Sequence, residues 1–322
     1  MADAFDDYAA RYHAAHQTPE AVLGRMVVRA TGSALAAKTR LTDGSNETYL
    51  VTTALGRECL LKIALLPETD LVQEAWAMDQ CRAAGALTPE VLFVGAEEGR
   101  AFMVQAKAPG RPLSTVLARL GEAERAQLWP QVGAALRMIH SVAAGGFWRR
   151  QSDGGWDFPS WVSVMNSTVR DRGAERPLLV QAGFSEQDCD EMMRLLVRYR
   201  DEFDCPQPVL CHCDYLPEHL FVTDDLRFSA VVDFGDFCGD HPIRDLAMAD
   251  EDEEMDLAGL LEGYADDWTR GERFEDCLYF HRLTLDMGYL AHFLRELPGH
   301  PSTAFHVQAL RATLDWLLNQ GW

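Results

Sequence analysis

The sequence predicts an α+β protein with two lobes: a small antiparallel-sheet lobe with one helix over residues 1–107, and a larger, mostly helical lobe over 108–322. Three observations lead to this prediction. Apolar, β-branched runs joined by short turns fill much of the first hundred residues. Helical spacing of apolar residues dominates the rest of the chain. The 322 residues suit two average domains or one large two-lobed domain.

The N-terminal lobe is predicted from four segments. Apolar positions at helical spacing indicate a helix within residues 1–30. Two β-branched runs around a tight turn indicate a hairpin over 47–65. A stretch that begins with proline and acids and ends with glycine indicates a helix over 67–85. A second pair of apolar runs indicates two further strands over 90–108.

The C-terminal lobe follows a Pro-Gly-Arg-Pro sequence at 109–112, which is typical of a linker. One β-rich segment is expected at about 209–234. The expected helices cover residues 122–141, 185–203, 256–269, 273–296 and 301–319.

The composition narrows the possible partners. The net charge of −21 repels nucleic acid and anionic membranes and favours a cationic ligand, although acidity that only confers solubility explains it equally well. The N-terminus has no signal-peptide pattern, and no apolar stretch reaches the ~20 residues that span a bilayer. Eight scattered cysteines do not indicate a disulfide scaffold. We expect a cytoplasmic monomer or homodimer without nucleic-acid or membrane partners.

Two features of the N-terminal lobe are suited to nucleotide phosphates. Lys62 lies in an apolar strand, and Glu74 lies on the next predicted helix. A lysine and glutamate placed in this way can position phosphates, whereas an edge-strand lysine that reaches water is the alternative. Gly44, Ser45 and Asn46 form a small polar turn whose backbone N–H groups can bind phosphate, or an ordinary loop.

The segment 211–222, CHCDYLPEHLFV, concentrates residue types that perform chemistry. Asp214 lies in a loop between two predicted strands, and Asp233 ends the next strand. Because we expect the strands to be neighbours, both carboxylates should lie in one site with His219. A carboxylate that orients a hydroxyl group, with a carboxylate and an imidazole that bind Mg²⁺, is the set that phosphoryl transfer needs.

Two rival interpretations concern the cysteines of this segment. Cys211 and Cys213, with His212 or His219, are conceivable zinc ligands, but apart from Cys205 the usual second pair of ligands is missing. A nucleophilic cysteine assisted by histidine and aspartate is the second rival, and the segment matches no known signature of that kind. Buried, inert cysteines are the simpler interpretation.

Together these motifs resemble the aminoglycoside phosphotransferase family, small-molecule kinases with a protein-kinase-like fold that are related to choline, macrolide and fructosamine kinases. The resemblance covers about residues 35–300. A segment at 145–165 also looks like the hygromycin phosphotransferase branch. Each motif is loose, but their joint order and spacing are specific. The motifs are DGSNETYLV, Lys62, Glu74, APGRPL, HCDYLPEHLFV, VVDFGD and HPIRDLA.

The resemblance implies how the nucleotide is bound. Lys62, held by Glu74, would contact the α- and β-phosphates of ATP or GTP. The turn at residues 44–46 would cover the phosphates. The stretch from Gln105 to Ala108, which includes Lys107, would contact the base through backbone groups.

The resemblance also implies roles in and after the segment 211–222. Asp214 matches the catalytic aspartate and His212 its supporting histidine. Asp233 matches a metal-binding aspartate, and His219 stands where most of the family has a metal-binding asparagine. Asp245 matches an aspartate that braces the catalytic loop.

The chain departs from the family pattern at three positions. His219 replaces asparagine, and because Mg²⁺ prefers oxygen it is a less secure ligand than Asp233. His241 replaces an aspartate, which alters the bracing of the loop. Cys213 replaces the usual small residue of the H-G-D motif, and a thiol is small enough to be tolerated.

The run MADEDEEMD at 248–256 indicates where a cationic substrate would bind. In the family the drug lies against an acidic C-terminal lobe, so Asp250, Glu251 and Glu254 are expected to contact the substrate. Trp161 is expected to form a wall of the pocket. The alternatives are a solvated helix N-terminus, where the dipole favours acids, and a tryptophan that belongs only to the core.

The resemblance therefore implies an ATP- and Mg²⁺-dependent phosphotransferase that transfers the γ-phosphoryl group to a hydroxyl of a small, cationic substrate such as an aminoglycoside, an activity linked to antibiotic resistance. The alternatives are a metabolic kinase for choline, an amino sugar or another small alcohol, and a pseudokinase that only binds nucleotide. The intact set of Lys62, Glu74, Asp214 and Asp233 argues against the pseudokinase.

Overall fold

The computed structural model describes residues 17–41, 44–67, 69–300 and 302–322, which form two compact units. The first unit combines the described part of Met1–Gln131 with Pro217–Phe237, and the second combines Val132–Leu216 with Cys238–Trp322. An antiparallel sheet dominates the N-terminal region and helices dominate the C-terminal region, which confirms the predicted α+β class. The predicted lobe boundary at 107/108 stays a prediction.

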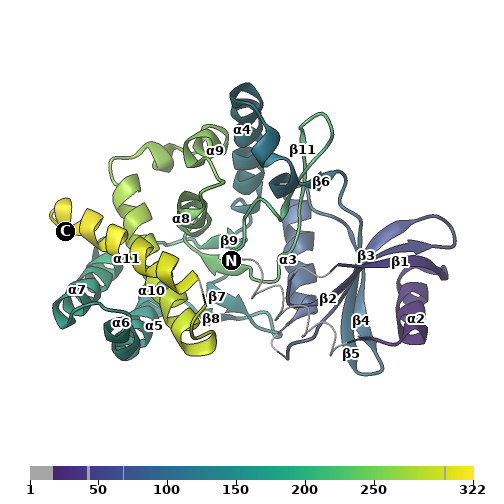
Figure 1. Ribbon diagram of the computed structural model, residues 1–322, viewed down its shortest axis with the longest axis horizontal. Coiled ribbons are helices and arrows are strands. Elements are labelled where there is room, and N and C mark those ends of the chain that lie inside the picture. The colour runs from purple at the N-terminus through teal and green to yellow at the C-terminus, as the bar shows by residue number, and fades with distance from the viewer. Residues whose placement is uncertain (1–16, 42–43, 68, 301) are drawn as a thin grey trace. The chain divides into compact units, whose positions relative to one another are not determined.

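The first unit is built on a five-stranded antiparallel sheet (Figure 1). Apolar and polar side chains alternate along β2, so every second residue is buried, as expected for a strand with one covered face. β3 lies in the middle of the sheet, between β2 and β5. In spatial order the strands are β1 (Leu35–Leu41), β2 (Glu47–Thr53), β3 (Glu58–Ile63), β5 (Arg100–Ala106) and β4 (Val91–Glu97).

Two helices pack on this sheet. α2 (Glu20–Thr31) lies against β4 and contributes its apolar stripe to the core under β2 and β3 (Figure 1). α3 (Leu71–Ala83) is preceded by the N-cap residue Asp70, whose carboxylate accepts the N–H groups of Val72 and Gln73. Within the predicted 1–30 helix, residues 17–19 are not helical and residues 1–16 lie outside the described part of the chain.

A smaller sheet in the same unit carries the segment that precedes Asp233. Its order is β11-β10-β6, and β10 pairs antiparallel with both neighbours. β6 (Arg111–Pro112) arises from the predicted linker and leads into the 3-10 turns Leu113–Thr115 and Leu117–Arg119. The other two strands are β10 (Leu220–Val222) and β11 (Phe228–Val231).

The second unit is mostly helical, with one small sheet in the order β8-β7-β12-β9. α10 is its central helix and packs against α11, α8 and α7. α4 (Glu122–Ile139) contributes residues to both units. The strands are β7 (Phe147–Arg150), β8 (Trp156–Phe158), β9 (Val209–Cys211) and β12 (Cys238–Asp240). The helices are α5 (Trp161–Ala174), α6 (Arg176–Gln181), α7 (Glu186–Glu202), α8 (Ile243–Glu251), α9 (Leu257–Tyr264), the 3-10 turn Asp267–Arg270, α10 (Phe274–Glu296) and α11 (Ser302–Asn319).

One expectation about strand pairing is wrong. The strand before Asp214 is β9, which pairs with β12, whereas the strand before Asp233 is β11, which pairs with β10. The two strands therefore belong to different sheets and are not neighbours. The reason is that β9 completes its hydrogen bonds with a strand from residues 238–240, beyond the segment from which the pairing was predicted.

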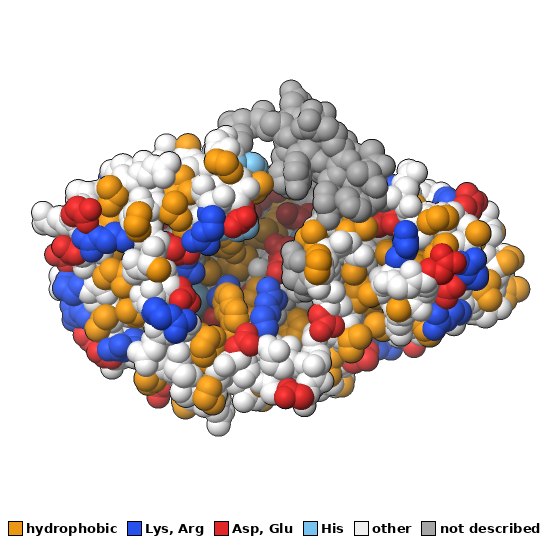
Figure 2. All heavy atoms as spheres, turned by 90° about the horizontal axis from the view of Figure 1, so that it is seen from below, with side chains coloured by type: hydrophobic (Ala, Val, Ile, Leu, Met, Phe, Trp, Pro, Cys, Tyr) orange, Lys and Arg blue, Asp and Glu red, His pale blue; other side chains and the backbone are white. Residues whose placement is uncertain are grey.

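Charge is spread over the surface. Figure 2 shows acidic and basic side chains interspersed across one face of the chain. Many exposed acids are paired with arginine, as in the contacts of Arg176 with Glu186 and Asp190. Among the described helices, none combines the length and apolar character needed to cross a membrane.

Two helical glycines give opposite predictions for substitution by alanine. A Cβ at Gly133 would lie 1.8 Å from the carbonyl oxygen of Leu260, so Gly133→Ala forces α4 and α9 apart and should lower the free energy of unfolding by ~2 kcal/mol. Gly24, within α2, has no atom within 4 Å of the added Cβ, so Gly24→Ala should raise stability by about 0.5–1 kcal/mol. Chemical denaturation of both variants measures this, and equal effects would contradict the packing of Gly133.

Candidate active site

Lys62 is the centre of a buried cluster in the first unit. It lies on β3, between Thr48 of β2 and Met103 of β5, so the alternative of an edge-strand lysine is wrong. Its Nζ donates to both carboxylate oxygens of Glu74, at 2.8 and 2.9 Å, and to Oδ1 of Asp233, at 2.8 Å. Burial lowers the pKa of Lys62, but the two carboxylates outweigh it and the pKa is raised, so the ammonium group stays charged.

The two acids of this cluster differ in exposure. The Glu74 side chain on α3 is 2% exposed, whereas that of Asp233 is 43% exposed. Asp233 has a left-handed backbone, with φ 64°, in the turn that follows β11. A Cβ at Gly235 would lie 3.3 Å from Oδ1 of Asp233, so glycine at this position keeps the space beside the carboxylate open.

The other predicted nucleotide-binding residues lie on the same unit. Gly44 and Ser45 are exposed in the turn before β2, and Gly44 has φ 88°, which suits glycine. The side-chain oxygen of Asn46 is buried without a hydrogen-bond partner. Gln105 is buried on β5, and the ammonium group of Lys107 binds Glu58 on the surface at 3.0 Å. Asp43, the first residue of the DGSNETYLV motif, lies outside the described residues.

Asp245 is the centre of a second cluster, in the second unit. It is fully buried on α8, and its carboxylate accepts the backbone N–H groups of His212 and Cys213, both at 2.7 Å. Nε2 of His140 lies 2.9 Å from the same carboxylate, and Nδ1 of His140 lies 2.9 Å from the hydroxyl of Tyr264. Burial raises the pKa of Asp245, but the hydrogen bonds with His140 and with the backbone of the loop outweigh it and the pKa is lowered. Asp245 therefore acts as a carboxylate that braces the loop.

The loop that carries Asp214 is held through its backbone. Nδ1 of His212 accepts the N–H of Asp214 at 3.2 Å, in addition to the two bonds to Asp245. Cys213 has φ 65°, a left-handed conformation that glycine adopts without strain, which explains why the H-G-D motif has a small residue there. Asp214 itself is partly exposed. The structure thus brings His212, Asp214 and Asp245 together.

His241 occupies the position where the family has an aspartate. Its Nδ1 accepts the N–H of Ile243, at 3.0 Å, in the first turn of α8. A carboxylate oxygen at a helix N-terminus makes the same kind of bond, so a neutral imidazole replaces its capping role. Burial lowers the pKa of His241 to about 4, which keeps the ring neutral and Nδ1 available as an acceptor.

The predicted metal ligands are Asp233 and His219. The carbonyl of His219 accepts the N–H of Val232 at 3.0 Å, so the two ligand segments run side by side. The half-exposed carboxylate of Asp233 offers the oxygen donors that Mg²⁺ prefers, whereas the imidazole of His219 offers nitrogen. The donor chemistry therefore fits magnesium at Asp233 and fits it less well at His219.

The side chains that could ligate a metal form a different group from the one that the zinc interpretation named. In the part of the chain that the structure describes, His140, Cys211 and Asp245 are the group whose donor atoms lie within 4.8 Å of one another. All three already have partners, since His140 binds Asp245 and the thiol of Cys211 lies 3.5 Å from the carbonyl of His241. Cys213 lies beside Cys238 instead of Cys211. Hydrogen bonds therefore explain the proximity of these three side chains without a metal ion.

The acidic run after Asp245 begins at the C-terminal end of α8 instead of at a helix N-terminus. Asp250 and Glu251 end α8, and both contact Arg282 of α10, at 2.6 and 3.3 Å. The helix-N-terminus explanation is therefore wrong for these two acids. It holds for Asp256, whose carboxylate accepts the N–H of Gly259 and caps α9. Glu254 is exposed between the two helices.

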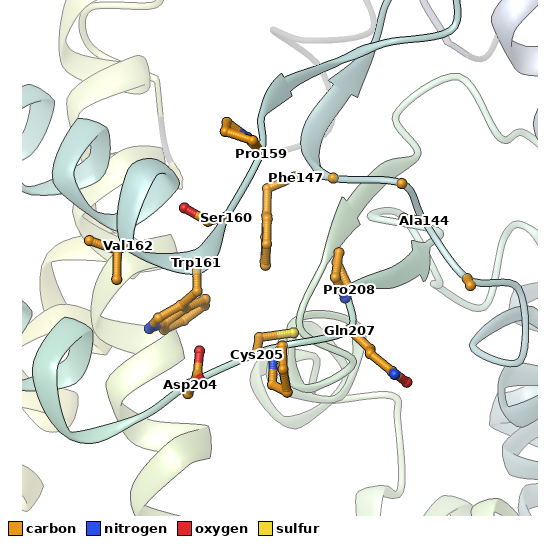
Figure 3. Close-up of a pocket in the computed structure, with 14 residues that line it drawn as sticks. Ala144, Phe147, Pro159, Ser160, Trp161, Val162, Asp204, Cys205, Gln207 and Pro208 are labelled. Carbon is orange, nitrogen blue, oxygen red and sulfur yellow. The ribbon is translucent and has the colours of Figure 1, made fainter.

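Trp161 belongs to the core and also lines a pocket of the second unit. Its indole N–H donates to the carbonyl of Arg200, and its ring packs edge-on against Tyr199. The pocket has a volume of about 510 Å³. Figure 3 shows the ring of Trp161 at its wall, with Phe147 and Cys205 close by. Asp214 and Asp250 are not among the described residues that line it.

Two buried polar residues of the second unit were missed from the sequence. His140 follows α4 directly and gives no motif, yet it contacts Asp245. Asp286 lies on α10, and burial raises its pKa to about 6, with one oxygen bound to Thr313 and the other without a partner. For Asp286 the sequence signal is a polar residue among the apolar positions of the predicted 273–296 helix, whereas His140 gives no signal of its own.

A sequence model of the family described as "Phosphotransferase enzyme family" matches residues 37–278. The chain belongs to this family. The predicted relationship to aminoglycoside phosphotransferases is therefore confirmed, and the chain is a phosphotransferase. No curated protein matches the chain in sequence.

Solved structures of this family share the fold. Aminoglycoside phosphotransferase APH(4)-Ia superposes with a TM-score of 0.70 at 16% identity, over 92% of this chain and 99% of that chain. A thermostable mutant of APH(4)-Ia with AMP-PNP and hygromycin B gives 0.68 at 17% identity, over 91% and 97%. The streptomycin–ATP complex of APH(2″)-IIa gives 0.59 at 13% identity, over 93% and 97%. At these identities the likeness establishes the fold.

The buried ion pair of Lys62 predicts a large loss of stability when one partner is removed. Glu74→Gln should lower the free energy of unfolding by about 3 kcal/mol, because it leaves a buried ammonium with Asp233 as its remaining charged partner. Glu58→Gln is the matched control, since it breaks the exposed pair with Lys107 and should change stability little. Chemical denaturation of both variants tests this, and equal losses would contradict it.

The lowered pKa of His241 predicts that stability falls in acid. Between pH 6.5 and about 4 the unfolded chain binds a proton at residue 241 that the folded chain does not, so the free energy of unfolding decreases as pH falls through this window. The shift corresponds to about 3 kcal/mol in full. His241→Asn keeps an acceptor for the N–H of Ile243 and removes the titration. Unfolding of both proteins at several pH values should show a shallower dependence in the variant, and identical slopes would refute this.

Proposed function

We propose that the chain transfers the γ-phosphoryl group of ATP, in the presence of Mg²⁺, to a hydroxyl of a small cationic substrate of the aminoglycoside class. The observation that carries the proposal is the buried cluster of Lys62, Glu74 and Asp233, with contacts of 2.8 to 2.9 Å, in a chain of the phosphotransferase family. This cluster places one fixed cation among groups that suit phosphate and metal.

Lys62 is the phosphate-binding group of this proposal. Glu74 uses both carboxylate oxygens to fix the ammonium group, so the lysine is already oriented before a nucleotide arrives. The backbone N–H groups at Gly44 to Asn46 supply further donors to phosphate. In this proposal the backbone groups of Gln105 to Ala108 contact the base. The side chain of Lys107 binds Glu58 on the surface, which leaves the backbone of this stretch as the group that contacts the base.

The charge of the same cluster favours a divalent cation. One ammonium and two carboxylates carry a net charge of −1, and Asp233 is the exposed member. Asp233 is therefore the first metal ligand in this proposal, and His219 the second. A Mg²⁺ ion held by these residues would supply positive charge that neutralises the phosphates. GTP in place of ATP would use the same groups.

Asp214 is the residue that acts on the acceptor. It orients the substrate hydroxyl and accepts its proton as the phosphoryl group is transferred. His212 and Asp245 position Asp214 through three backbone hydrogen bonds of 2.7 to 3.2 Å. Neither of these two residues needs to touch substrate for this role.

The acids of α8 and of the loop that follows it support the proposed substrate class. Asp250 and Glu251 share one arginine, Arg282, so acidic groups outnumber basic ones at this end of the helix, although burial raises the pKa of Glu251. Glu254 is exposed nearby in sequence and adds a further carboxylate. Such an excess of acids suits a polyamine sugar more than a neutral alcohol. We extend the proposal to a role in antibiotic resistance, and Trp161 remains a proposed wall of the substrate pocket.

The test is a purified-protein assay with ATP and Mg²⁺ against hygromycin B, other aminoglycosides, choline and amino sugars. We expect a phosphorylated aminoglycoside, identified by its mass. Asp214→Asn should lower kcat by about 100-fold or more, because the variant cannot accept the hydroxyl proton. Asp224→Asn is the matched control, because Asp224 is exposed and, among the described residues, forms a salt bridge with Arg111 alone.

The assay separates the proposal from its alternatives. Phosphorylation of choline or an amino sugar alone would indicate the metabolic kinase. Nucleotide binding without transfer to any acceptor would indicate the pseudokinase. ATP turnover that Asp214→Asn leaves unchanged would contradict the role given to Asp214.

A further inference from the structure

Two cysteine thiols lie next to each other beside the loop of Asp214. The Sγ atoms of Cys213 and Cys238 are 3.2 Å apart, roughly 1.2 Å more than the length of a disulfide bond. Both residues belong to the second unit. Cys238 begins β12, and Cys213 lies two residues after the end of β9, the strand with which β12 pairs. The strand pairing therefore holds the two sulfur atoms close.

The two thiols have complementary exposure. All eight cysteines lie in the described part of the chain, and Cys213 alone among them is not buried. A soluble oxidant can therefore reach Cys213, whereas Cys238 is 1% exposed. An accessible thiol beside a buried one is the arrangement in which the first is oxidised and the second resolves the product.

A cation lies close to both sulfur atoms. The guanidinium group of Arg244 has a raised pKa: burial acts to lower it, but it is outweighed by the neighbouring thiols of Cys213 and Cys238 and by Asp240. Arg244 binds Asp240 at 3.1 Å, and its Nε is buried without a hydrogen-bond partner. The hydrogen bond with Cys213 and burial raise the pKa of the Cys238 thiol, so Cys238 stays a thiol until Cys213 has been oxidised.

We propose that Cys213 and Cys238 are a reversible oxidation site, in which hydrogen peroxide or an organic hydroperoxide converts the two thiols to a disulfide and thereby inactivates the loop of Asp214. The sulfur of Cys213 attacks the peroxide, gaining oxygen as a sulfenic acid and releasing water or an alcohol. The thiol of Cys238 then displaces the hydroxyl, forming the S–S bond and a second water. An added dithiol reverses the oxidation by thiol–disulfide exchange.

The disulfide acts on the loop because of where Cys213 lies. Its N–H is held by Asp245 at 2.7 Å, its backbone is in a left-handed conformation, and Asp214 is the next residue. Drawing the two sulfur atoms together pulls this strained residue toward β12. A shift of about 1 Å at a catalytic group is enough to lower a rate by as much as 100-fold. The effect on activity rests on the proposed function, whereas formation of the disulfide does not.

Mass spectrometry tests the bond independently of activity. The native full-length protein is treated with hydrogen peroxide, its remaining thiols are blocked, and it is digested with trypsin without reduction. Cleavage after Arg200, Arg227 and Arg244 places Cys213 in peptide 201–227 and Cys238 in peptide 228–244. We expect these peptides to be linked, with the loss of two hydrogens, and to separate on reduction.

Variants assign the bond within the first peptide, which also contains Cys205 and Cys211. Cys213→Gly suits the left-handed backbone and removes the thiol, so the link should disappear. It should also disappear in Cys238→Ser and persist in Cys211→Ser, the matched control. A link that survives in Cys213→Gly, oxidation that stops at sulfenic or sulfinic acid, a link between two chains, or zinc bound by the two thiols would each overturn the proposal.

The activity arm compares oxidised with reduced protein for each variant. Oxidation should lower the phosphoryl transfer of the original chain by about tenfold or more, with recovery in dithiothreitol. In Cys213→Gly and Cys238→Ser the ratio of oxidised to reduced activity should stay close to one. A disulfide without loss of activity would refute the inactivation. A disulfide in a protein that phosphorylates no acceptor would refute the proposed function and leave the oxidation site standing.

Discussion

One buried carboxylate, Asp245, fixes the loop on which the proposed chemistry depends. It is fully buried, and an isolated charge in such a place would cost several kcal/mol. Two backbone N–H groups and the imidazole of His140 supply the compensating hydrogen bonds. Because His140 also contacts Tyr264, the same network links the end of α4 with α8 and α9. The position of Asp214 is therefore coupled to helix packing in the second unit.

The cluster around Lys62 uses a different principle. Its contacts join side chains to one another instead of a side chain to the backbone. They connect an ammonium group on β3 with carboxylates on α3 and on the turn after β11. Its net negative charge and the exposure of Asp233 suit a site that binds a charged ligand. The Asp245 network, in contrast, is closed and satisfied internally. One cluster is built to receive a ligand, and the other to keep a loop in place.

The spacing of apolar residues was sufficient to predict a helix or strand that buries one regular face. The β2–β3 hairpin, α3, α7 and α10 lie close to their predicted positions for this reason. β1 was not predicted, because most of its side chains are exposed and leave no alternating pattern. The periodicity also missed α5, whose apolar positions are interrupted by polar residues, and α6, whose six residues are too few to form a periodic pattern.

The candidate site was predicted best where chemistry is local in sequence. Lys62 with Glu74, and Asp245 with the loop after β9, were expected from motifs that the family shares. Contacts that depend on strand pairing were not predicted, as the pairing of β9 with β12 shows. The same pairing places Cys238 beside Cys213, twenty-five positions apart, a proximity that no spacing rule reveals.

The way Asp245 holds its loop has a consequence for how this sequence can evolve. It binds the amide groups of residues 212 and 213, which every amino acid except proline possesses. A side chain can therefore change at position 213 without loss of either bond, and backbone strain is the main obstacle to replacing glycine. A lineage can thus acquire a new chemical sensitivity at the catalytic loop through single substitutions while the machinery for phosphate chemistry stays intact.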